Sequence, residues 1–202
     1  MTLSLHPDHI ADLEKSGLSK ETILLAEIET VRPDRINKEL GFNLPGLTSM
    51  YKIPYNDKFA RFRCFYDDGK TGAKYLQKKG TRNYLYFPPN LDRSILQAVD
   101  VPLYFTEGEK KSLRACQEGI PCVGLSGLWN WQDKKGNLIP NFDSIKLQNR
   151  IIRLVPDDDW QTPNKHGYGK NLKQAVYRLA GKLKERGARV FIVDLAGGNN
   201  GR

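Results

Sequence analysis

The spacing of apolar residues differs between the two halves of the 202-residue chain. In residues 6–30 the apolar side chains recur three or four positions apart, which predicts two short helices, the second capped by Ser19. From residue 50 to residue 87 apolar and polar positions alternate, which predicts short paired strands around a turn at Asn56 and Asp57. We therefore expect the chain to open with a small α+β region.

Strand and helix patterns alternate in residues 101–198. Four apolar runs have the length of strands, namely 103–106, 121–125, 151–155 and 189–195. Helical spacing follows the first and third runs, at residues 110–118 and 171–186. This order predicts an α/β fold with a mostly parallel sheet flanked by helices. We place that domain at residues 99–202, preceded by a basic α+β subdomain at residues 1–98.

The composition, 39% hydrophobic and 27% charged residues, is sufficient for a packed core. No run approaches the roughly 20 apolar residues of a membrane helix, and the first residues lack a signal-peptide pattern. We therefore expect a soluble, cytoplasmic protein without a membrane partner. The cysteines lack the spacing of a disulfide framework or a zinc site, so we expect reduced core thiols at Cys64, Cys116 and Cys122. The histidines have no ligand spacing, and we expect surface positions for His6, His9 and His166.

The formal net charge of +9 is unevenly distributed. Residues 1–50 hold five basic and eight acidic side chains, residues 51–93 hold ten and four, and residues 160–202 hold nine and two. Such segregation favours a polyanionic partner, nucleic acid rather than membrane.

Basic residues of the first half stand among aromatic residues. Arg61 and Arg63 share one face of a predicted strand, as a phosphate-binding pair would, although a solvated strand face has the same pattern. A basic loop beside Tyr75 and Tyr84 is typical of single-stranded nucleic acid binding, unless these tyrosines belong to the core. Its members are Lys74, Lys78, Lys79 and Arg82.

Carboxylates follow two of the predicted parallel strands. Glu107 ends one apolar run, and Asp157, Asp158 and Asp159 follow another. Ligands of such sheets bind at the carboxyl ends of the strands, and clustered carboxylates suit Mg²⁺ or Mn²⁺. If the two strands are neighbours, the sequence predicts a divalent-metal site here. The alternative is that the three aspartates only cap a turn.

The order of these motifs resembles the Toprim domain of bacterial-type primases, topoisomerases and some nucleases. The resemblance rests on residues 106–110 (TEGEK), on the glycine-containing segments 119–121 and 124–127, and on Asp157-x-Asp159. Residues 16–23 resemble the helical part that opens the core of such primases, and residues 53–57, 61–63, 74–76 and 84–86 resemble the small basic part that precedes Toprim there. The resemblance covers about residues 9–198 and is nearest to primase-like proteins of plasmids, phages and integrated elements.

The resemblance implies metal-dependent nucleotidyl transfer on a single-stranded DNA template, with nucleoside triphosphates as substrates and a helicase as partner. Catalytic carboxylates holding one or two Mg²⁺ or Mn²⁺ ions would be Glu107, Asp157 and Asp159. Additional metal ligands would be Glu109 and Asp158. The start of the next helix, whether facing substrate phosphate or merely solvated, carries Lys110 and Lys111.

Two other functions use the same residues. A Toprim nuclease would employ the acids to activate water, and a non-catalytic module would bind DNA for an attached helicase. We do not expect a topoisomerase, because these 202 residues are too few for the separate strand-passage domain. Lys111 stands where many primases carry a second acid, and the zinc module that usually precedes the primase core is absent. We expect the chain, with its glycine-rich end, to be part of a longer protein.

Overall fold

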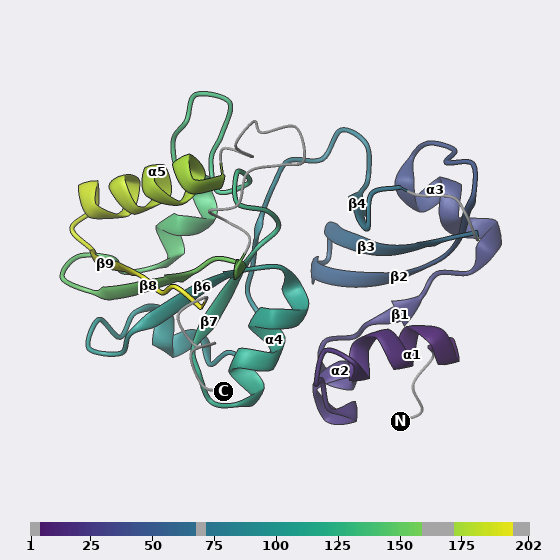
Figure 1. Ribbon diagram of the computed structural model, residues 1–202, viewed down its shortest axis with the longest axis horizontal. Coiled ribbons are helices and arrows are strands. Elements are labelled where there is room, and N and C mark those ends of the chain that lie inside the picture. Colours follow the sequence, from purple (N-terminus) through teal and green to yellow (C-terminus); the bar gives the residue numbers. More distant parts are fainter. Residues whose placement is uncertain (1–4, 68–71, 159–171, 196–202) are drawn as a thin grey trace, which may run out of the picture. The chain divides into compact units, whose positions relative to one another are not determined.

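The computed structural model describes residues 5–67, 72–158 and 172–195 (Figure 1). Two units make up the chain, Met1–Arg82 and Asn83–Arg202. Their boundary lies earlier than the predicted junction after residue 98. The reason is that β5 (Leu85–Tyr86), expected in the first unit, pairs antiparallel with β7 (Cys122–Leu125) of the second. None of the helices in the described part of the chain has the length and apolar character to span a bilayer.

The first unit is an antiparallel sheet with short helices. Its described helices, including the 3-10 helix η1, are α1 (Pro7–Glu14), α2 (Lys20–Leu25), η1 (Pro33–Arg35) and α3 (Ile36–Leu40). Its sheet has the order β1-β2-β3-β4 and consists of β1 (Glu29–Thr30), β2 (Leu47–Asn56), β3 (Phe59–Tyr66) and β4 (Tyr75–Gln77). The Ser19 hydroxyl accepts a hydrogen bond from the Thr22 amide at 3.2 Å, so the predicted helix cap is confirmed.

Successive side chains of β2 and β3 point to opposite faces of the sheet, and both faces contain buried residues. On one face Met50, Phe62 and Cys64 pack in a hydrophobic cluster with Ile36 and Leu40 of α3. The opposite face carries Tyr51, Arg63 and Phe65, because side chains two positions apart point the same way. These three side chains contact α1: Tyr51 and Arg63 contact Asp12, and Phe65 stacks on His9.

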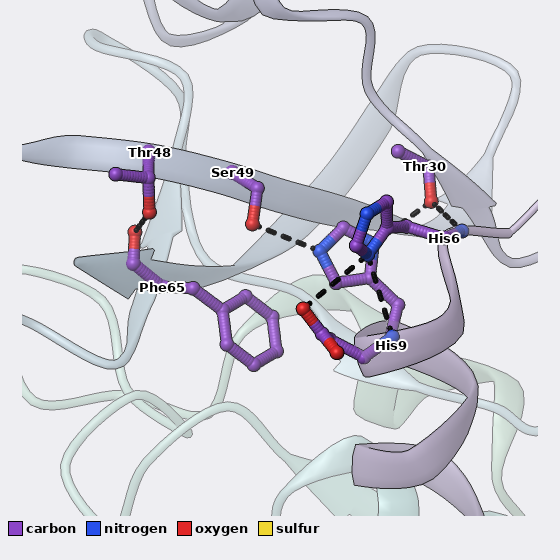
Figure 2. A network of polar contacts seen from close by, with 7 residues as sticks. His6, His9, Thr30, Thr48, Ser49 and Phe65 are labelled. Atoms are coloured by element: carbon purple, nitrogen blue, oxygen red, sulfur yellow. Dashed lines mark hydrogen bonds and ion pairs between the residues drawn. The ribbon is translucent and has the colours of Figure 1, made fainter. Parts of the chain in front are cut away.

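His9 of α1 is fully buried on this second face, so the prediction of a surface position is wrong (Figure 2). Its Nδ1 forms a hydrogen bond with the Thr30 hydroxyl at 2.8 Å, and its Nε2 with the Ser49 hydroxyl at 3.1 Å. The ring stacks on Phe65 with centroids 4.8 Å apart. Because hydroxyls donate or accept, the neutral imidazole satisfies both partners, and α1 is thereby attached to the sheet. His6 is exposed as expected, and His166 lies outside the described residues.

The burial of His9 predicts that the first unit loses stability in mild acid. Burial lowers the pKa of His9 below 6.5, and the neighbouring His6 lowers it further. The unfolded chain therefore takes up a proton below pH 6.5 that the folded state does not bind, so the free energy of unfolding falls as the pH falls. Urea unfolding followed by circular dichroism should give a lower midpoint at pH 5.0 than at pH 7.5. His9→Gln should be less stable at pH 7.5 but less dependent on pH, whereas His6→Gln should keep the acid-induced loss; an unchanged pH dependence in His9→Gln would contradict this.

The second unit contains the predicted mostly parallel sheet. The order of its described strands is β5-β7-β6-β8-β9, in which β5 is antiparallel and the other neighbours are parallel. The strands not yet given are β6 (Leu103–Glu107), β8 (Ile151–Val155) and β9 (Arg189–Ile192). The helices are η2 (Arg93–Leu96), α4 (Glu109–Gln117), η3 (Pro140–Ser144) and α5 (Leu172–Glu185). In Figure 1, α5 and α4 lie on opposite sides of the sheet.

One large core holds this unit together. Phe105 and Leu154 of the sheet pack in it with Val176 and Leu179 of α5, and Trp131 is fully buried there. The cysteine prediction is also confirmed for the whole chain, because all three thiols are free and only Cys116 is partly exposed. Burial raises the pKa of Cys64 to about 11, so this thiol stays protonated and unreactive at neutral pH.

Arg150, just before β8, is a charged residue inside this unit and has no exposed surface. Its Nε, Nη1 and Nη2 donate hydrogen bonds to the carbonyls of Val101, Leu96 and Ile95, at 3.0, 3.0 and 2.8 Å. The guanidinium thus satisfies carbonyls at the end of η2 and at the entry to β6. The sequence gives no local sign of this role, since the arginine merely precedes an apolar run.

Candidate functional site

The acidic residues stand at the ends of two neighbouring strands. β6 and β8 pair in parallel with Thr106 opposite Val155. Glu107 is the last residue of β6, and Asp157 follows β8 after a single proline. The condition on which the predicted metal site depended, that these strands are neighbours, is therefore met. We call Glu107, Lys111 and Asp157 with their surroundings the acidic edge.

A sharp turn at Gly108 separates the two glutamates of the motif. Gly108 has φ 92°, a conformation that favours glycine, and its amide donates to the Leu125 carbonyl at 2.7 Å. The following helix α4 lies close to β7. A Cβ added at Gly124 would be 2.7 Å from the Ser112 hydroxyl, so glycine is needed for this approach. The predicted turn is therefore present, and it leaves Glu107 in the strand and Glu109 in the helix.

The two glutamates have different surroundings. Glu107 is partly exposed and borders an apolar hollow lined by residues of the sheet and of α5, including Phe105, Leu154 and Val176. Glu109 is only 1% exposed. Burial and the charge of Glu109 raise the pKa of Tyr86, which shows that the carboxylate lies near this phenol. Its burial favours a structural role for Glu109 over that of a metal ligand.

Lys111 forms an ion pair with Asp157. The ammonium Nζ contacts Oδ1 of the aspartate, and both side chains are partly exposed, at 53% and 36%. Lys110 is half-buried and Asp158 exposed, while Asp159 lies outside the described residues. Sequence reasoning placed Lys111 opposite a substrate phosphate or solvent and missed this partner. The sequence did carry one signal for this pair, because Lys111 stands where many primases carry a second acid.

The donors of the acidic edge fit one hard cation in their chemistry. Glu107 and Asp157 offer carboxylate oxygens, which Mg²⁺ and Mn²⁺ prefer. Among residues 5–67, 72–158 and 172–195, however, no three acidic, histidine or cysteine side chains come together as a metal-binding group. Lys111 also neutralises one of the two carboxylates. The described residues therefore suit one divalent ion better than two.

The two arginines of β3 that were predicted to bind phosphate, Arg61 and Arg63, make different contacts. Arg63 Nη2 lies 3.4 Å from Asp12 Oδ1, with both side chains less than one-fifth exposed, and the Tyr51 hydroxyl donates to the other Asp12 oxygen at 2.8 Å. Arg63 therefore attaches α1 to the sheet. Arg61 lies on the same face, with its guanidinium carbon 5.3 Å from the centre of the Tyr75 ring. The arrangement favours Arg61 over Arg63 as a nucleic-acid contact.

The basic loop around β4 is open to solvent. Lys74 comes directly before the strand and the other three predicted nucleic-acid contacts follow it; all four are exposed: Lys74, Lys78, Lys79 and Arg82. Tyr75 is half-buried and lies against the arginines of β3. This combination of exposed cations and a partly exposed aromatic ring is typical of surfaces that bind single strands.

The fold is similar to two solved structures of primases. "Structure of the DnaG catalytic core" has 19% identical residues and a TM-score of 0.56, and the match covers 93% of this chain and 65% of that one. "E. coli primase catalytic core" has 18% identical residues and a TM-score of 0.55, with 98% and 68% covered. The chain thus spans about two thirds of the length of these cores. It has the Toprim-containing fold of a primase catalytic core, which confirms the predicted fold class.

The family of the chain follows from a second comparison. Residues 93–201 match a family described as "Domain of unknown function (DUF3854)". Because this match covers more than half of the sequence, the chain belongs to that family. No curated protein matches the chain. The family description assigns no activity, so function must be argued from the fold and the acidic edge.

Proposed function

We propose that this chain is a primase-like module that carries out metal-dependent nucleotidyl transfer on single-stranded DNA during replication. The observation that carries the proposal is the placement of Glu107 and Asp157 at adjoining strand ends within a primase-core fold. The separate basic loop supplies the complementary feature, a surface for the template. The resemblance of residues 9–198 to plasmid and phage proteins supports a place in mobile-element replication, next to a helicase.

The roles of the residues follow from their positions. Glu107 and Asp157, with Asp159, would hold Mg²⁺ or Mn²⁺, which when bound orients the triphosphate and stabilises charge on the leaving phosphate. Lys110, at the start of α4, would face the phosphates of the nucleotide. Glu107 also borders the apolar hollow lined by Phe105, Leu154 and Val176. In such apolar surroundings a carboxylate and a bound cation interact more strongly than in water.

A single assay separates this function from its rivals. The full chain is incubated with single-stranded DNA, nucleoside triphosphates and Mg²⁺ or Mn²⁺, and new primers and shortened templates are measured on the same gel. We expect primers and an intact template. Shortened template without primers would support a nuclease, and neither product, with DNA binding retained, would support the non-catalytic module.

Template binding should depend steeply on salt through the basic loop. Affinity for single-stranded DNA falls with salt by a slope of about −0.7 per neutralised phosphate. Replacing the exposed Lys74, Lys78 and Lys79 by alanine should make the slope shallower by about two. It should also weaken the binding of every DNA sequence to the same extent. Fluorescence anisotropy at several salt concentrations measures the slope.

The matched control removes the same charge from the acidic end of the first unit. Its three exposed lysines are Lys15, Lys20 and Lys38, and replacing them by alanine should leave the slope nearly unchanged. Equal slopes for both triple variants would show that only net charge matters and that the basic loop is not the template surface. Arg63→Ala is unsuitable for this test because it would leave Asp12 without its ion pair.

A further inference from the structure

Lys111 occupies a position that is unfavourable for a cation on its own. It lies in the first turn of α4, where the helix dipole is positive and favours acidic side chains. Lys110 precedes it, so two lysines stand side by side in that turn. A nearby anion offsets this repulsion. Asp157, contributed by the end of β8, is that anion.

We propose that Lys111 is a built-in counter-cation of the acidic edge. Its ammonium supplies positive charge to Asp157 that a second divalent ion would otherwise provide, so the edge binds one divalent ion and not two. The inference rests on the proposed function, because it concerns the same edge. It deepens that function by assigning the number of ions and the residue that sets it.

Charge at the acidic edge supports this assignment. Two carboxylates next to each other repel one another and together attract cations. A lysine paired with one of them removes about half of that attraction. The pair is partly exposed, and such pairs contribute only about 0.2–1 kcal/mol to stability. Removing Lys111 should therefore leave the fold intact. It should also leave Asp157 available to a metal ion.

The test measures metal binding and not activity. Mn²⁺ is titrated into the full chain, free Mn²⁺ is followed by electron paramagnetic resonance, and the number of bound ions and their affinity are fitted. The wild type should bind one ion. Lys111→Met should bind Mn²⁺ about tenfold more tightly, the size expected when a unit charge about 6 Å from a divalent ion is removed at the dielectric of water. Lys111→Asp should bind a second ion.

Two further variants serve as controls. Lys111→Arg keeps the charge and should bind Mn²⁺ as the wild type does. Lys146→Met removes one exposed lysine of the same unit, near the opposite end of β8, and should also leave Mn²⁺ binding unchanged. Thermal unfolding of each variant verifies that it is folded.

The outcomes separate this inference from the function on which it rests. If Lys111→Met and Lys111→Asp bind Mn²⁺ like the wild type while Glu107→Gln loses it, the acidic edge is the metal site and the counter-cation is refuted. If the wild type already binds two ions at this edge, the counter-cation is refuted as well. If Glu107→Gln binds Mn²⁺ as the wild type does, the proposed metal site itself is wrong.

Discussion

Glutamine in place of Glu107 is expected to lower nucleotidyl transfer by about a hundredfold or more, the scale of a lost acid–base or electrostatic group. Glu107 ends β6 beside the end of β8 and is partly exposed, at the edge of the sheet where a cation and substrate would bind. Glutamine has nearly the same shape, and the fold should be retained. Primer synthesis is measured at saturating Mn²⁺ and compared with single-stranded DNA binding by the same variant. This comparison distinguishes a loss of catalysis from a loss of template binding.

Glu109→Gln is the matched control for this experiment because it lies in the same motif. Its side chain is buried near Tyr86, and we expect a smaller loss of activity together with some loss of stability. A greater loss of activity in Glu109→Gln than in Glu107→Gln would contradict the assignment. The metal site would then have to be placed around Glu109.

Methionine in place of Arg150 is expected to lower the free energy of unfolding of the second unit by about 1–3 kcal/mol. The variant removes the guanidinium donor from three carbonyls: Val101 loses this hydrogen bond, whereas the carbonyls of Ile95 and Leu96 keep the amide donors of Ala98 and Lys146. Each buried group that loses its partner costs about 1–3 kcal/mol. All three tryptophans belong to the sequence of this unit, so urea unfolding followed by tryptophan fluorescence reports on it directly.

Arg189→Met is the control for Arg150→Met. Arg189 begins β9 and is exposed, so its replacement should change the free energy of unfolding by no more than about 0.5 kcal/mol. Equal effects of the two substitutions would show that the carbonyl contacts of Arg150 contribute little. Arg150→Lys should fall between them, since an ammonium keeps the charge but lacks the planar guanidinium that spans the three carbonyls.

Local features of the molecule were predictable from the sequence alone. Apolar periodicity predicted the strand at residues 151–155 without error, the α4 helix to within one residue at each end, and the C-terminal end of α5 to within one residue. Ser19 and Gly108 marked a helix cap and a sharp turn through their own side-chain and backbone chemistry. The Toprim-like fold class followed, because strand–helix alternation and the glutamate–glycine turn are properties of neighbouring residues.

Only the tertiary structure decided which distant residues meet. The pairing of β5 with β7, the burial of His9 between Thr30 and Ser49, and the ion pair of Lys111 with Asp157 all join residues far apart in sequence. Periodicity indicates which face of a strand or helix is apolar, but not which other element covers it. Strand order is set by the packing of the whole sheet. For that reason the sequence by itself determined the acidic residues of the edge, and the fold determined that a lysine pairs with one of them.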